Sequence, residues 1–325
     1  MTNFQVYRKT LSFSLLEFLV DMFALAVLAG CCTAGFFIAD NTPSSRALIG
    51  LVIGLVVGII LDVLISVFIS NRIKAAQIAM MTKGVTEDEL PDHPFHAGFQ
   101  EIRGRFGAIT AFFFITNAIK GIFRELGRAI NQLGTAIGGD VGNGITSAID
   151  SAVQTLISYL CDCCLGWILF RKDVIAAKAG CEGAVIFFKH GKTLARNVGR
   201  IFGMGFLSLL IIGGGFFGLS YWIFTLYPGM FERLIAEISD LITRNGGTVP
   251  ELFQNTTFTM LLIAGIVGII IWGILHSVLI RPFILTGVLR NFMAAGIKDI
   301  PTEQDFAELD SKSSRFAKLH KSYKN

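Results

Sequence analysis

The chain has 325 residues, of which 53% are hydrophobic and only 16% are charged, and its mean hydropathy is +0.62. A soluble domain carries about 25% charged residues, so this composition excludes a soluble enzyme, a disulfide-stabilised secreted scaffold and a disordered chain. The chain is rich in Phe (29) and Gly (35) and poor in Pro (7), and its formal net charge is +4. We expect an all-α, polytopic integral membrane protein that binds no nucleic acid.

Four apolar stretches are long enough to cross a bilayer, which takes about 20 residues. They run from about Leu15 to Ala39, from Ala47 to Ser70, from Ile201 to Leu226 and from Phe258 to Ile280. A short turn joins the first two stretches into an antiparallel hairpin. The predicted segments are an N-terminal hairpin with its loop (1–98), a middle region with a basic segment (99–199), a C-terminal hairpin (200–294) and a cytoplasmic tail helix (295–325).

The middle region is amphipathic between residues 106 and 170. Lys120, Arg124 and Arg128 recur every four residues opposite an apolar face, which predicts a basic helix at the interface, among anionic headgroups. A second amphipathic stripe follows a glycine-rich break at residues 138–144. The region forms either two further crossings or a helical hairpin in the interface or the protein interior. We favour six crossings in total.

The distribution of charge predicts the orientation. Lys and Arg collect at the N-terminus, after the second crossing, between Arg171 and Arg200, and after the last crossing, whereas the connection from Tyr227 to Thr257 is acidic. Because basic loops stay in the cytoplasm, we expect both termini to be cytoplasmic, with the cell membrane as the location. This orientation allows four or six crossings.

A ridge of small and polar residues runs along the second crossing. It consists of residues spaced four apart, namely Gly50, Gly54, Gly58, Asp62, Ser66 and Ser70. Glycine lets two helix backbones approach closely in lipid. The ridge therefore predicts either packing against another helix of the chain, or a polar path or subunit contact in a homo-oligomer.

The first crossing carries a matching polar face with Thr10, Ser14, Glu17 and Asp21. A carboxylate at mid-membrane costs about 2.5–3.5 kcal/mol, so these acids pair with the basic residues of the middle region, contact an ion or substrate, or lie at the membrane interface. By the geometry of a hairpin, Asp62 lies near the same side. We predict that the three acids converge and that they line the path of a substrate or ion.

Other chemistry is weakly represented in the sequence. His276, in the last crossing, is either a solute contact or a buried, satisfied histidine. No nucleotide-binding, nucleophile or zinc-protease motif occurs, and His93 and His96 lack a second cluster of metal ligands, so we expect no enzyme, no metal and no cofactor. Three cysteines (Cys161, Cys163 and Cys164) indicate free or acylated thiols. A short likeness between residues 86–90 and 302–306 hints at a duplication.

From about Leu160 onward, the order of features resembles the C-terminal half of the choline-transporter-like family. The matching stretches are Cys163-Cys164-Leu165, Lys189 to Lys192, Ala195 to Arg200, Gly213 to Gly218 and Ser277 to Phe292. This chain departs from the family, which has about ten crossings and a large outer loop. In addition, Arg290-Asn291-Phe292-Met293 stands where the family has an acidic motif after its last crossing. The resemblance implies a small organic cation as the solute, with the three acids supplying negative charge.

Together these patterns predict a membrane transport protein, either a carrier or an oligomeric pore, for a small solute or ion. The alternative is a non-transport membrane protein that organises or scrambles lipids or acts as an assembly partner. The lipid bilayer and its anionic headgroups are the partners expected in both cases.

Overall fold

The computed structural model describes residues 1–40, 47–104, 118–125, 143–229 and 255–324, together with single residues between 107 and 116 and between 232 and 239. Within these ranges the chain is helical between short connections and contains no strand, so the predicted all-α fold is confirmed. Four helical segments are long and apolar enough to cross a membrane: Asn3–Ala39, Ile49–Thr86, Gly199–Leu226 and Thr256–Lys298. The chain is an integral membrane protein.

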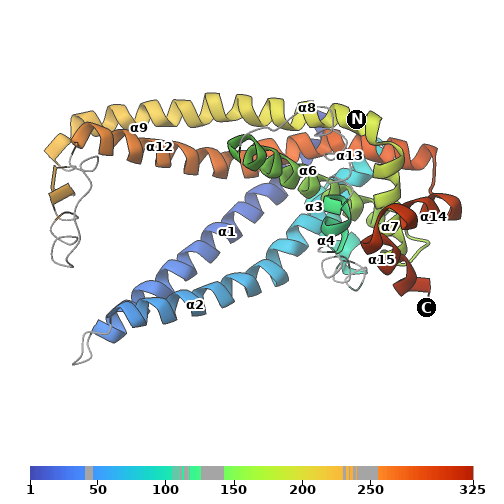
Figure 1. The fold of residues 1–325 in the computed structure, drawn as a ribbon, viewed down its shortest axis with the longest axis horizontal. Helices are drawn as coiled ribbons and strands as arrows, with labels where there is room; N and C mark the ends of the chain where they lie inside the picture. Colours follow the sequence, from blue (N-terminus) through green and yellow to red (C-terminus); the bar gives the residue numbers. More distant parts are fainter. Residues whose placement is uncertain are drawn as a thin grey trace. The chain divides into compact units, whose positions relative to one another are not determined.

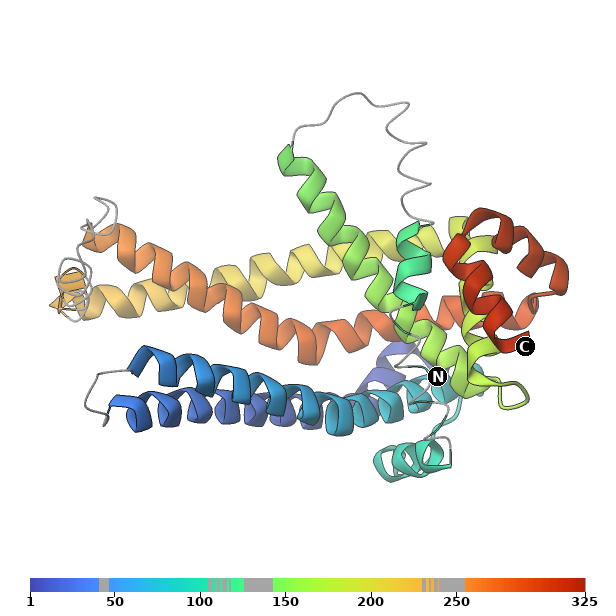
Figure 2. The ribbon, with the colours of Figure 1, turned by 60° about the horizontal axis from the view of Figure 1, so that its bottom comes forward.

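The N-terminal hairpin consists of α1 (Asn3–Asp40) and α2 (Ala47–Ile65), which lie side by side (Figure 2). A π-helical segment, η1 (Ser66–Ser70), continues α2 into α3 (Asn71–Thr86). The apolar side chains of α2 and η1 are largely exposed up to Ile69, whereas those of α3 are buried from Ile73 onward. At this point the continuous helix changes from exposed apolar side chains to side chains packed in a protein core.

The core beyond that point is formed by helices from both ends of the chain. It contains α3, α6 (Asn143–Phe170), α7 (Ala176–Lys189) and α13 (Arg281–Lys298) (Figure 1). Two glycines allow close packing here, because a Cβ at Gly166 would meet Leu289 and a Cβ at Gly296 would meet the Trp167 ring. The short helices α4 (Pro94–Arg103), α14 (Glu303–Lys312) and α15 (Ser314–Lys324) complete this unit.

The second half of α6 belongs to this core and not to the lipid. Its residues from Tyr159 to Leu169 are buried, and Asp162 forms a 2.7 Å ion pair with Lys74 of α3. The apolar part that is described, Gln154–Phe170, is shorter than a membrane span. The structure thus has four spans among its described residues, and of the alternatives for the middle region it favours the protein interior for this helix. Residues 126–142 lie outside the described ranges.

The cysteines of α6 are core residues. Cys161, Cys163 and Cys164 are buried together with Cys181 of α7, and all four are free thiols. Burial raises the pKa of Cys181 to about 12, so its thiol stays protonated at neutral pH. Of the two alternatives that the sequence left open for these cysteines, the structure favours free thiols. They are closely packed, since a Cβ at Gly183 would meet the Cys164 side chain.

The C-terminal hairpin forms most of a second compact unit, Arg200–Arg281. Its first arm is built from α8 (Gly191–Ser208), η2 (Leu209–Gly213) and α9 (Gly214–Leu226), and its second from α12 (Thr256–Leu275) and η3 (His276–Ile280). The helices α9 and α12 pack along each other, with Gly213 and Gly268 at a close approach of the two backbones. Asn255 caps α12 by accepting a hydrogen bond from the Phe258 amide.

The second half of the chain repeats the element order of the first. In the first half, α2 has 19 residues and is followed by a π segment of 5, a helix of 16 and a short helix of 10. In the second half, α12 has 20 residues and is followed by a π segment of 5, a helix of 18 and a short helix of 10. This order extends the likeness between residues 86–90 and 302–306 to whole elements.

Candidate functional site

The glycine ridge of α2 faces α1 of the same chain. A Cβ on Gly50 would clash with the carbonyl oxygen of Gly35, and a Cβ on Gly54 would clash with that of Cys31. Gly58 lies in the same way against the Leu28 side chain. Without side chains at these positions, the two backbones come into direct contact, which is the geometry that small residues permit in lipid. The glycines of the ridge therefore pack against α1 of the same chain.

Beyond the glycines, the ridge becomes polar and more open. Asp62 and Ser66 are exposed, and the Ser70 hydroxyl donates a hydrogen bond of 3.5 Å to the Asp21 carboxylate of α1. Ser66 to Ser70 form the π segment η1, which inserts an extra residue into a helical turn and is frequent at functional sites. The π segment therefore belongs to the same end of the hairpin as Asp21.

The two aspartates lie on the two arms of the hairpin. Asp21 belongs to α1 and Asp62 to α2, which pack side by side, and the Ser70 hydroxyl of η1 reaches the Asp21 carboxylate. Glu17 is half-buried and precedes Asp21 by one turn of α1. We name Glu17, Asp21, Asp62 and Ser70 the acidic site. The convergence of the three acids that the sequence leads us to expect stays a prediction.

A buried hydrogen-bonded contact closes the hairpin next to the acidic site. The Gln77 amide of α3 donates to the Ser14 hydroxyl at 2.6 Å and to the Thr10 carbonyl oxygen at 3.4 Å. Thr10, Ser14 and Gln77 are all buried. The polar face of α1 therefore has two parts: Thr10 and Ser14 are structural and pair with α3, whereas Asp21 is exposed.

The basic residues of the middle region have other neighbours. Arg124 donates a 2.8 Å hydrogen bond to the Gln154 side chain of α6, and Lys120 is half-buried, near Cys161. Arg128 lies outside the described residues. The pairing of the hairpin acids with these basic residues stays a prediction.

His276 lies at the start of η3 in the C-terminal hairpin. Its ring packs against Trp272 with the centroids 5.2 Å apart, and it is half-buried. Trp272 donates a 3.0 Å hydrogen bond to Ser208, whose hydroxyl donates to the Gly205 carbonyl oxygen at 2.7 Å. These contacts hold the two arms of that hairpin together. Because His276 belongs to the second compact unit, we do not assign it to the acidic site.

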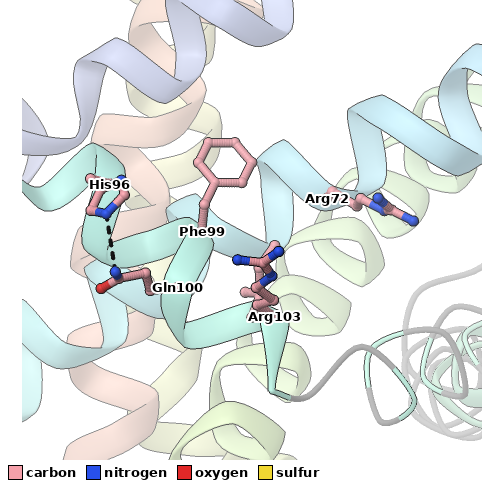
Figure 3. Close-up of a pocket in the computed structure, with 6 residues that line it drawn as sticks. Arg72, His96, Phe99, Gln100 and Arg103 are labelled. Atoms are coloured by element: carbon pink, nitrogen blue, oxygen red, sulfur yellow. Dashed lines mark hydrogen bonds between the residues drawn. The ribbon is translucent and has the colours of Figure 1, made fainter.

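Two features of the first unit escaped the sequence patterns. Glu182 is buried, accepts hydrogen bonds from Trp167 at 2.8 Å and Arg171 at 3.1 Å, and has a pKa raised by burial. Arg72, His96 and Arg103 line a surface pocket between α3 and α4 (Figure 3). Arg72 follows an apolar run and Arg103 ends α4, but nothing in the sequence indicates that the two helices meet there.

Neither a search for metal-ligand clusters nor the comparisons with known proteins assigns a function to the acidic site. Among the residues that the structure describes, no three His, Cys, Asp or Glu side chains lie together as metal ligands would. No family model, no curated protein and no solved structure matches the chain. The acidic site must therefore be interpreted from its own geometry.

Proposed function

We propose that the chain is a membrane transport protein for a small cation, and that the acidic site is where the cation binds. The observation that carries this proposal is the placement of Asp21 and Asp62 on two packed arms of a hairpin that is long and apolar enough to cross a membrane, with Asp21 hydrogen-bonded to Ser70 of η1. Two like charges in a medium of low dielectric repel each other strongly. A cation between them removes that repulsion and compensates for part of the loss of hydration.

The surroundings of the acidic site suit a transient ligand. Asp21 and Asp62 are both exposed, and the hydrogen bond from Ser70 to Asp21, at 3.5 Å, is long. Ionisable residues within membrane segments generally line ion or substrate pathways. The resemblance to the choline-transporter-like family makes a quaternary ammonium ion a natural probe beside the alkali cations. We place both termini in the cytoplasm and expect the chain to act in the cell membrane, as a homo-oligomer.

The proposal can be tested with purified protein in liposomes. We expect uptake of labelled choline or flux of K⁺ or Na⁺ above that of empty liposomes, with chloride flux unchanged. The variant D21N/D62N keeps the size of both side chains and should lose the cation flux by about tenfold or more, because it removes both charges.

Asp92→Asn is the matched control for this experiment. It makes the same chemical change at an exposed position in the loop after α3, outside the membrane spans, and should transport like the wild type. Cation flux that is absent from wild-type liposomes, or that survives in D21N/D62N, would contradict the proposal.

The second candidate is a protein that organises or scrambles lipids. It is favoured by Arg72, which directly follows the apolar part of the second hairpin arm, because a basic residue there suits anionic headgroups. Fluorescent lipids in the same liposomes distinguish the two functions. Lipid flipping without cation flux would replace transport by this candidate.

A further inference from the structure

A pocket of about 410 Å³ opens between the start of α3 and the helix α4. Figure 3 shows Arg72 on α3, whereas His96, Phe99, Gln100 and Arg103 project from α4. Ile102 completes the lining. The volume falls within the range of small-molecule sites, about 300–1,000 Å³.

From the sequence, we place the pocket near the end of the apolar part of the second hairpin arm. The apolar run of residues 49–69 spans about 32 Å as a helix, close to the thickness of a hydrocarbon core. Arg72 follows this run by less than one turn. The headgroups of phospholipids are found at this depth, so one wall of the pocket begins at the headgroup layer.

The helix α4 is held against the hairpin by aromatic packing. Phe95 and Phe99 lie 5.0 and 5.9 Å from the Phe13 ring of α1, measured between ring centroids. Gly98 fits closely against Phe13 and the Ala76 carbonyl oxygen, where a Cβ would be crowded. The pocket wall is therefore fixed before any ligand arrives.

The polar groups of the pocket suit a phosphate. Two guanidinium groups, of Arg72 on α3 and Arg103 on α4, line the pocket. Guanidinium binds phosphate oxygens through paired hydrogen bonds. His96 and Gln100, joined by a 3.0 Å hydrogen bond, add polar ring and amide groups, while Phe99 and Ile102 offer an apolar wall.

We propose that this pocket binds the phosphate ester group of an anionic phospholipid. The apolar wall contacts the glycerol and the first acyl carbons, and the arginines contact the phosphate. A soluble phosphate ester has the same charged group, but the position beside the span favours the lipid. This binding site is separate from the acidic site, and it would exist whether or not the chain transports a cation.

The test uses the full chain in a non-ionic detergent, titrated with short-chain phosphatidylglycerol, short-chain phosphatidylcholine or glycerol phosphate. We expect phosphatidylglycerol to bind most tightly. The variant R72Q/R103Q should weaken this binding by about tenfold or more, because charge-assisted hydrogen bonds to phosphate are lost. The single variant R103Q, at an exposed helix end, gives a smaller loss and remains informative if the double variant does not fold.

The matched control is R8Q/K9Q, which removes the same net charge from exposed positions of α1. It should weaken binding by less than about threefold. An equal loss in both variants would overturn the proposal, since it would show attraction to general basic charge. Unchanged binding by R72Q/R103Q would also overturn it. Equal binding of glycerol phosphate would retain a phosphate site but overturn the lipid as its source.

Discussion

The return arms of the two membrane hairpins share their element order, but the hairpins differ in their polar groups. Both begin with a long arm, return through an apolar helix of 19 or 20 residues, and pass through a π segment of 5 residues into a buried helix. The N-terminal hairpin carries Glu17, Asp21 and Asp62 along its membrane-spanning part. No Asp or Glu occurs in residues 201–226 or 256–280 of the C-terminal hairpin.

The absence of acids from the spans of the C-terminal hairpin shows which residues a hairpin of this kind needs in order to fold. Both hairpins pack through small residues, with Gly50 and Gly54 in one and Gly213 and Gly268 in the other. The C-terminal hairpin therefore packs its two arms through small residues without any acid in its membrane-spanning helices. Because the acids are not needed to build such a hairpin, we attribute them to the activity of the N-terminal one.

The largest expected effect tests the packing that both hairpins share. Gly54→Leu should lower the free energy of unfolding by about 3 kcal/mol or more, because the new side chain would push the α1 backbone away. Gly30→Leu is the control within the same hairpin, since a Cβ there meets nothing. Thermal unfolding in detergent measures both. Similar losses in the two variants would refute the close contact between α1 and α2.

The second prediction concerns the stability of the acidic site. Asp62→Leu should raise the free energy of unfolding by about 2 kcal/mol, because an exposed leucine is favourable in lipid where a carboxylate is not. If the acids instead serve as structural partners, the same substitution will lower the stability. The sign of the change in melting temperature decides between these two roles.

The third prediction concerns the contact between Glu125 and the start of α15, and it predicts how the stability of the fold depends on pH. Burial alone would raise the pKa of Glu125, but hydrogen bonds from Ser313, Ser314 and the Arg315 amide outweigh it and hold the pKa below its ordinary value of 4.5. A lowered pKa stabilises the fold above pH 4.5, and this contribution is lost as the pH falls through the folded-state pKa.

Glu125→Gln should accordingly lower the stability by about 1 kcal/mol at neutral pH. The difference from the wild type should shrink as the pH falls below 4.5, and melting curves over that range measure it. A difference that stays constant with pH would show that the charge of Glu125 makes no contribution.

The smallest effect is expected in the C-terminal hairpin. Ser208→Ala removes the hydroxyl that accepts the Trp272 hydrogen bond, and should lower the stability by about 1 kcal/mol. Trp272→Phe removes the donor instead, and the double variant should lose less than the sum of the two single changes. Strict additivity in this cycle would mean that the two side chains do not interact.

The sequence predicted the features that depend on a single helix. The four spans and the spacing of the glycine ridge follow from residue patterns, because lipid requires long apolar helices. The core of α3, α6, α7 and α13 was not predicted, because it joins segments that are distant in the sequence. The apolar composition of these segments is also similar to that of membrane spans. Likewise, Gln77 pairs with Ser14 across 63 positions, and only the fold brings such groups together.

The most direct test of the proposed cation site compares the cation flux of variants altered in one hairpin or the other. Liposomes containing wild-type protein, D21N/D62N or the C-terminal variant S208A should be measured for the same cation under the same gradient. We predict that S208A transports like the wild type and that D21N/D62N loses about tenfold or more of the flux. Equal flux in all three would contradict the assignment of the activity to the acids of the N-terminal hairpin.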